Sequence, residues 1–77
     1  MSKTKAVVDA IRGQAYFDAP LQDYHAAKAV LAAMRRRDPS SRLSGVREAL
    51  NKYRVSAWLD DNGGIVLRRD GRPVLSL

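Results

Sequence analysis

The sequence changes character at Tyr53, and this change limits the folds that the chain can adopt. Before Tyr53, apolar residues recur every three or four positions, which is typical of amphipathic helices. After it come three β-prone runs separated by turn-forming residues: Val55 to Leu59, Ile65 to Leu67 and Val74 to Leu77. Helices followed by strands predict an α+β fold, with three helices and then a C-terminal antiparallel hairpin or three-stranded meander.

The N-terminal half predicts two helices. The first covers residues 5–11, where apolar residues from Val8 to Ala15 have helical spacing. The second begins near Asp18, a good N-cap residue, with Pro20 in its first turn. Its apolar stripe consists of Leu21, Tyr24, Ala27, Leu31 and Met34.

A third helix is predicted to follow Asp38 and Pro39, which suit the N-cap and the first helical position. Its buried stripe is Leu43, Val46, Leu50 and Tyr53. A rotation of about 100° per residue places polar side chains on the opposite arc. These are Ser44, Glu48, Asn51 and Lys52, with Arg47 and Arg54 at the border. We expect the second helix, through Leu31 and Met34, and the third helix, through its stripe, to pack on the sheet.

Residues 55–59 allow two interpretations. Their β-prone composition predicts a first strand, which we favour. Ala57 also continues the helical spacing from Tyr53, so the run could instead extend the third helix, with Asn62 and Gly63 at its C-terminal end.

The last hairpin carries three arginines around a turn. A three-residue turn over 69–71, with Gly71 left-handed, would pair Val66 with Val74 and Ile65 with Leu75. Either plausible register sets two cations from the group Arg68, Arg69 and Arg72 opposite each other. Because opposed like charges destabilise a ladder, a bound phosphate would relieve the repulsion.

Size and composition limit the chain further. Its 77 residues form one small basic domain, residues 1–77, whose thin core would gain from a partner or from a second copy in a homodimer. The absence of cysteine excludes Cys-ligated zinc and thiol catalysis. The longest uncharged apolar run, Ala29 to Met34, is too short for a signal sequence or a membrane span, so we expect a cytoplasmic protein that does not bind membranes.

The formal net charge of +6 is concentrated in residues 35–54, which contain seven basic and two acidic residues. The basic ones are Arg35, Arg36, Arg37, Arg42, Arg47, Lys52 and Arg54. Three consecutive arginines at the end of the second helix exceed what its dipole requires. With Arg42, we expect them to add phosphate contacts to a nucleic-acid site.

The sequence contains no recognisable catalytic constellation. His25, the one histidine, lies in the alanine-rich second helix, with Asp23 on another face. Residues 60–64 suggest a calcium loop, but Gly71 stands where a bidentate glutamate would be needed. P-loop, GxGxxG and HExxH motifs are absent. We therefore expect no enzymatic activity, no metal site and no cofactor.

The third helix offers a surface that could read DNA. Arg47 and Asn51 are four residues apart, and their side chains suit guanine and adenine in the major groove, while Ser44 and Lys52 suit phosphates. The alternative is a solvated helix face stabilised by the Glu48–Lys52 pair.

The run Ser44-Gly45-Val46-Arg47-Glu48-Ala49-Leu50 contains VREAL, which resembles the recognition helix of GntR-type winged helix-turn-helix regulators. Residues 64–75, GIVLRRDGRPVL, resemble the wing that follows it in that family. The resemblance is confined to residues 44–77 and implies a winged-helix-like fold that binds DNA. It implies that Arg47 and Asn51 face bases and that Arg69 and Arg72 touch the minor groove or the backbone.

Two functional hypotheses follow. The first is a small basic DNA-binding protein, either a transcriptional regulator or an accessory factor. Its DNA-binding residues are Ser44, Arg47, Asn51, Lys52, Arg54, Arg68, Arg69 and Arg72. The second is a small phage-type inhibitor or adaptor that docks its basic face on an acidic protein of the nucleic-acid machinery. In that case an exposed Trp58, together with Tyr53, would anchor the protein interface.

Overall fold

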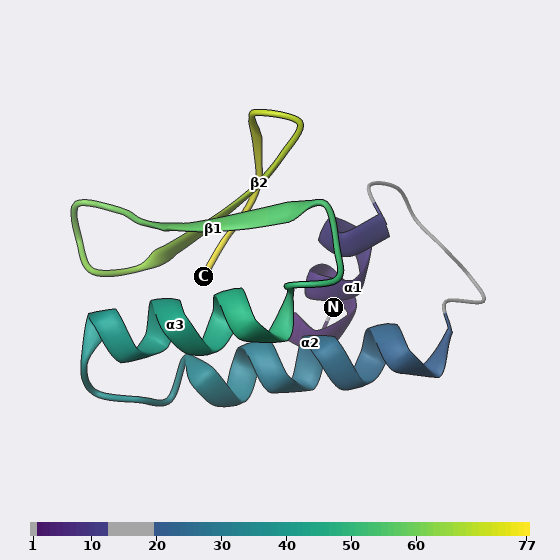
Figure 1. The fold of residues 1–77 in the computed structure, drawn as a ribbon, viewed down its shortest axis with the longest axis horizontal. Coiled ribbons are helices and arrows are strands. Elements are labelled where there is room, and N and C mark those ends of the chain that lie inside the picture. The colour runs from purple at the N-terminus through teal and green to yellow at the C-terminus, as the bar shows by residue number, and fades with distance from the viewer. Residues whose placement is uncertain (1, 13–19) are drawn as a thin grey trace.

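The computed structural model of the chain describes residues 2–12 and 20–77, a part that contains three helices followed by three strands (Figure 1). The elements are α1 (Lys3–Arg12), α2 (Leu21–Ala33), α3 (Pro39–Ala49), β1 (Val55–Leu59), β2 (Ile65–Arg69) and β3 (Arg72–Ser76). The predicted α+β fold with a three-stranded antiparallel meander is confirmed. Residues 55–59 form a strand, so the alternative extension of the third helix is wrong.

The sheet has the order β1-β2-β3, and α1 and α3 pack against one of its faces. α3 lies along β1, α1 packs against β3, and α2 packs against both of these helices (Figure 1). The sheet is therefore covered by α3, as expected, and by α1, which we had not expected there, whereas α2 packs mainly against the other two helices. Side chains alternate across the strands: Ala57 and Leu67 are buried under the helices, whereas Ser56 and Arg68 on the other face are exposed.

The two N-terminal helices differ in detail from the prediction. α2 begins at Leu21, with Pro20 at the N-cap position instead of the first turn, and the predicted Ala15 and Asp18 positions lie outside the described residues. The predicted stripe is wrong at Leu21, which is 71% exposed because this first residue extends beyond the core. The residues that α2 buries are Asp23, Ala27, Val30 and Ala33.

The start of α3 is as predicted. Pro39 is its first residue, and the Asp38 carboxylate accepts a hydrogen bond of 3.0 Å from the Ser41 amide. Val46 and Leu50 are buried as expected, but Tyr53 lies beyond the helix, which ends at Ala49. The polar helical arc that was predicted from the spacing to include Asn51 and Lys52 is therefore wrong at these two residues, which lie beyond the end of α3.

The β2–β3 hairpin has a shorter turn than predicted. Asp70 and Gly71 both have positive φ, 53° and 78°, so Arg69 pairs directly with Arg72 across a two-residue turn. Two consecutive left-handed residues are typical of a type I′ turn, whose twist matches that of the strands. Gly71 is left-handed as predicted, but the predicted register is wrong, because Leu67 pairs with Leu75 and Val66 with Ser76.

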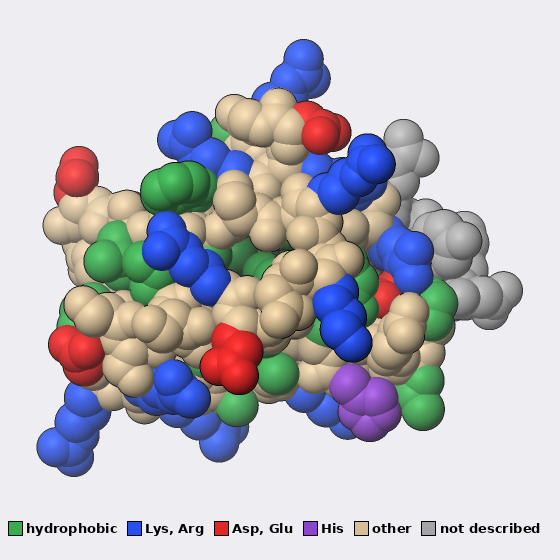
Figure 2. Space-filling model, in the orientation of Figure 1, with side chains coloured by type: hydrophobic (Ala, Val, Ile, Leu, Met, Phe, Trp, Pro, Cys, Tyr) green, Lys and Arg blue, Asp and Glu red, His purple; other side chains and the backbone are tan. Residues whose placement is uncertain are grey.

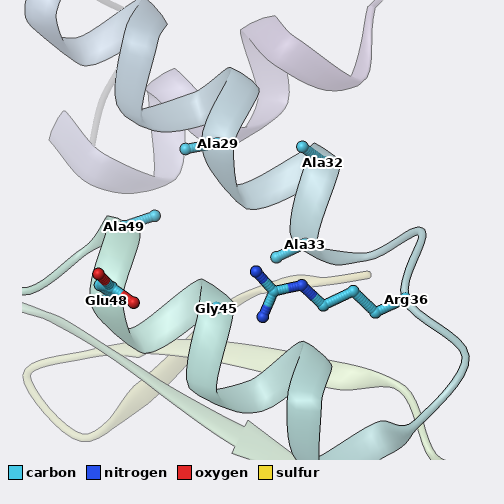
Figure 3. Close-up of a pocket in the computed structure, with 7 residues that line it drawn as sticks. All are labelled: Ala29, Ala32, Ala33, Arg36, Gly45, Glu48 and Ala49. Atoms are coloured by element: carbon cyan, nitrogen blue, oxygen red, sulfur yellow. The ribbon is translucent and has the colours of Figure 1, made fainter.

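α2 and α3 approach each other closely at Gly45 (Figure 3). A Cβ atom at this position would lie 2.7 Å from the Cβ of Ala33 and 2.9 Å from Nη1 of Arg36. The hollow between the helices, about 470 Å³, is lined mainly by small side chains. Glycine inside α3 therefore sets the spacing of the helix pair.

We expect Gly45→Ala to destabilise the protein. The gain in helix propensity is about 1 kcal/mol, but overpacking costs about 1–3 kcal/mol, and Ala33 cannot rotate its Cβ away. Urea unfolding should show a net loss of about 1 kcal/mol. Ser44→Ala, at the neighbouring exposed position, is the control and should change stability by less than about 0.5 kcal/mol. A Gly45→Ala protein more stable than the parent would contradict this packing.

Candidate nucleic-acid interface

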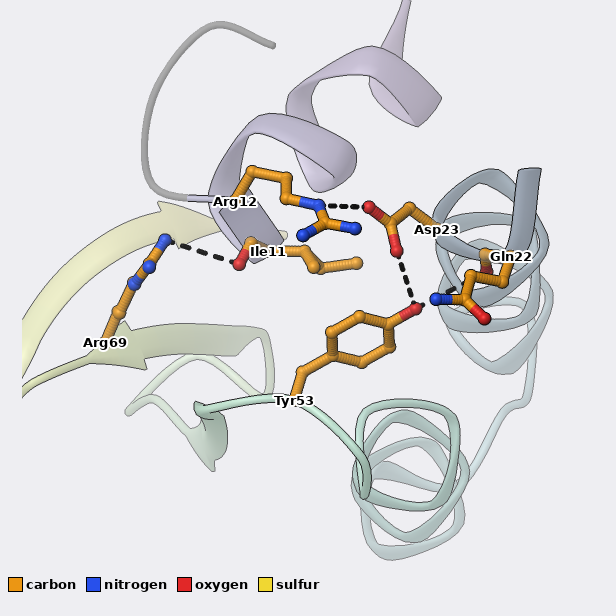
Figure 4. A network of polar contacts seen from close by, with 6 residues as sticks. All are labelled: Ile11, Arg12, Gln22, Asp23, Tyr53 and Arg69. Atoms are coloured by element: carbon orange, nitrogen blue, oxygen red, sulfur yellow. Dashed lines mark hydrogen bonds and ion pairs between the residues drawn. The ribbon is translucent and has the colours of Figure 1, made fainter. Parts of the chain in front are cut away.

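A buried ion pair joins α1 to α2 beneath the arginine-bearing end of the sheet (Figure 4). Asp23 is 0% exposed and is the one buried charged residue in the described part of the chain. Its carboxylate accepts hydrogen bonds from Nε of Arg12 and, at 2.9 Å, from the hydroxyl of Tyr53. The pair is thus satisfied from both sides, as a buried charge requires.

The Tyr53 hydroxyl remains neutral to higher pH than an ordinary tyrosine. Burial, then the hydrogen bond to Asp23 and its negative charge, raise the pKa of Tyr53 above 10.0, while Arg12 acts in the opposite direction. The sequence does not predict the hydrogen bond between Tyr53 and Asp23, because these residues lie 30 positions apart and no local pattern links them.

Arg69 connects the hairpin to this cluster. Its Nη1 donates a hydrogen bond of 3.3 Å to the carbonyl of Ile11, near the C-terminal end of α1 (Figure 4). Arg69 is half-buried, so its guanidinium contributes to tertiary structure as well as to surface charge.

Three other arginines surround the same end of the sheet and are exposed. Arg54 precedes Val55, which pairs with Arg69, and Arg72 lies opposite Arg69 in the hairpin. Arg68 precedes Arg69 in β2 and lies on the uncovered face of the sheet, whereas Arg69 lies on the face that the helices cover. The side chains of Arg54, Arg68 and Arg72 form no hydrogen bond or ion pair with the described residues. We call them the arginine end.

Arg47 and Asn51 lie in a different environment from the one that sequence spacing suggested. Nε of Arg47 donates to the Ala57 carbonyl at 3.0 Å, and its guanidinium carbon lies 5.0 Å from the centre of the Trp58 ring. Asn51 and Lys52 are exposed in the turn after α3. Arg47 and Asn51 still share a surface, because both line a groove between α3 and β1 with a volume of about 490 Å³.

The four arginines predicted as auxiliary phosphate contacts are of two kinds. Three of them follow α2, and Arg42 lies in the first turn of α3. Arg36 donates to the Ser41 carbonyl at 3.0 Å, and Arg42 donates to the carbonyls of Arg36, Arg37 and Gly63. These two close the loop. Arg35 and Arg37 are exposed, and no described residue binds their side chains. The predicted auxiliary set is therefore half structural.

Basic side chains are spread over the face of the molecule along which α3 and β1 run (Figure 2). They extend from the hairpin down to the helices, with separate acidic side chains among them. The charge therefore forms several small groups on this face, and the partner-free arginines of the hairpin and of the α2–α3 loop belong to different groups.

The remaining sequence motifs have local roles in the structure. Oδ1 of Asp60 accepts hydrogen bonds from the amides of Asn62, at 2.8 Å, and Gly64, at 2.7 Å, which stabilises the β1–β2 turn. His25 is exposed on α2. Residues 2–12 and 20–77 include no group of three or more potential metal ligands. None of their helices has the length and apolar character needed to cross a membrane.

Compared with known proteins, the chain matches no family model, no curated protein and no solved structure. The function must therefore be argued from the surface itself.

Tyr53→Phe should test the buried pair. Loss of the hydroxyl leaves the Asp23 carboxylate short of one donor, so we expect a loss of about 1–3 kcal/mol in urea unfolding at pH 7. Tyr24→Phe is the control, because the Tyr24 hydroxyl binds no described residue.

The pH dependence gives this test a second arm. A raised pKa means that the Tyr53 proton stabilises the fold fully below pH 10 and that this contribution is lost as the pH rises from 10 through the folded-state pKa. The stability difference between the parent and Tyr53→Phe should therefore shrink above pH 10. A difference that stays constant would argue against the hydroxyl–carboxylate bond.

Proposed function

We propose that this protein binds duplex DNA through the arginine end, Arg54, Arg68 and Arg72. The observation that carries the proposal is that three exposed cations without internal partners gather where the hairpin sets Arg72 opposite Arg69. Opposed like charges destabilise a strand pair, and a phosphate between them would reverse that effect.

The one acidic residue of the hairpin turn, Asp70, offsets the charge of the arginine end only in part. Asp70 occupies the turn itself, but it forms no ion pair with the neighbouring arginines. The described residues contain two ion pairs, Lys5–Asp9 and Arg12–Asp23, and both involve α1. The arginine end thus remains available for a polyanion, and charge neutralisation with counterion release would supply most of the affinity.

α3 contributes less to this proposal than the hairpin does. Ser44, Arg47, Asn51 and Lys52 are all exposed, but Nε of Arg47 is bound to the Ala57 carbonyl and its guanidinium lies over the Trp58 ring. Glu48 is exposed beside them and would repel phosphates. We therefore propose backbone binding with little sequence preference, in which α3 adds secondary contacts.

The salt dependence of DNA binding tests this proposal. Each phosphate contact adds about 0.9 to the slope of log K against log salt concentration, so Arg68→Ala/Arg72→Ala should reduce the slope by about 2. The measurement is fluorescence anisotropy with a 20-base-pair duplex of arbitrary sequence, at salt concentrations between 50 and 200 mM. Over this range, a protein that makes six phosphate contacts loses affinity by about a thousand-fold, so a change in slope can be measured.

Arg35→Ala/Arg37→Ala is the matched control, because it removes two equally exposed charges from the α2–α3 loop. Its slope should equal that of the parent protein. Equal reductions in both double variants would show that net charge, and not the arginine end, drives binding. No detectable binding by the parent at the lowest salt concentration would reject DNA as the partner.

A further inference from the structure

The groove between α3 and β1, which we call the Trp58 groove, adjoins the arginine end at Arg54, which lies between the lining residues Tyr53 and Val55. Its volume is about 490 Å³. One side is formed by Arg47, Asn51 and Tyr53 and the other by Val55, Ala57 and Trp58. The groove therefore follows the length of β1.

The strand along this groove has a free edge. β1 is the first strand in the order β1-β2-β3 and, within residues 2–12 and 20–77, pairs only with β2. In an antiparallel ladder, alternate residues direct their backbone groups to opposite edges. The Ala57 carbonyl accepts its hydrogen bond from Arg47, so this carbonyl faces the groove. The backbone groups of Val55 and Leu59, two positions before and after Ala57, therefore face the same free edge and can pair with an extended chain in the groove.

The groove contains the residue types that are most common in protein-binding hot spots. These types are Trp, Tyr and Arg, and Trp58, Tyr53 and Arg47 all line the groove. Trp58 is 51% exposed although it is the largest apolar residue of the chain. Its Nε1 donates to Oγ of Ser56 at 3.0 Å and Arg47 lies over its ring, so the indole is held in place before any partner arrives.

The charge of the groove identifies the chemistry of its occupant. None of the lining residues is acidic, Arg47 lies within the groove, and the exposed Lys52 and Arg54 flank Tyr53 in sequence at one end. We propose that the Trp58 groove binds an extended acidic segment of a partner protein. Its backbone pairs along β1, an apolar side chain packs on Trp58, and its carboxylates meet Arg47 and Lys52.

Trp58 provides the readout, because it is the single tryptophan of the chain. Ten-residue random peptides displayed on phage are selected on the full chain and counter-selected on Trp58→Ala, and enriched peptides are synthesised. We expect peptides of net negative charge that change the Trp58 fluorescence on titration. Arg47→Ala should weaken their binding at least tenfold, whereas Arg37→Ala, which removes an exposed arginine outside the groove, should leave it unchanged.

Asn51→Ala provides a second groove variant, and far-UV circular dichroism checks that each variant is folded. Four outcomes would overturn the proposal. Selected peptides could lack net negative charge, or Arg47→Ala and Arg37→Ala could have equal effects. A ten-nucleotide single strand could also change the fluorescence with higher affinity than the peptides, which would make nucleic acid the occupant. The fourth is a concentration-dependent dimer, detected by sedimentation, that Trp58→Ala dissociates; it would show that a second copy fills the groove.

Discussion

A fully buried carboxylate, that of Asp23, imposes the strongest constraint on this structure. Removing one partner from a buried ion pair typically costs about 3–5 kcal/mol, a large fraction of the stability of a small domain. Asp23 takes its donors from α1, through Arg12, and from the segment that leads into β1, through Tyr53. These contacts fix where α1 and α2 meet and where the sheet begins. Arg69 extends the same cluster to the hairpin through Ile11.

The arginines consequently serve different purposes, which net charge cannot separate. Arg12, Arg36, Arg42 and Arg69 bind a buried carboxylate or backbone carbonyls and so maintain the fold. Exposed arginines without such partners remain at the arginine end and in the α2–α3 loop. The first group therefore holds the hairpin and the α2–α3 loop in place, and the second group lies exposed on them.

Sequence reasoning succeeded where local chemistry decides the structure and failed where distant residues meet. The Asp38–Pro39 start of α3 and the left-handed Gly71 follow from local preferences and are confirmed. The hairpin register was wrong because turn length depends on Asp70 also adopting positive φ. The contact between Arg69 and Ile11 spans 58 residues and has no signature in the sequence. Helical spacing predicted that Arg47 lies on an open helix face. Spacing alone could not show that β1 and Trp58 lie beside this arginine.

Direct observation of the arginine side chains gives the sharpest test of the central claim that the arginine end contacts DNA. In ¹H–¹⁵N spectra, Nε resonances of individual arginines can be followed as a duplex of arbitrary sequence is added. The account predicts that the Nε signals of Arg54, Arg68 and Arg72 shift together, while those of Arg35 and Arg37 remain in place. Shifts confined to the α2–α3 loop, or equal shifts at every exposed arginine, would contradict it.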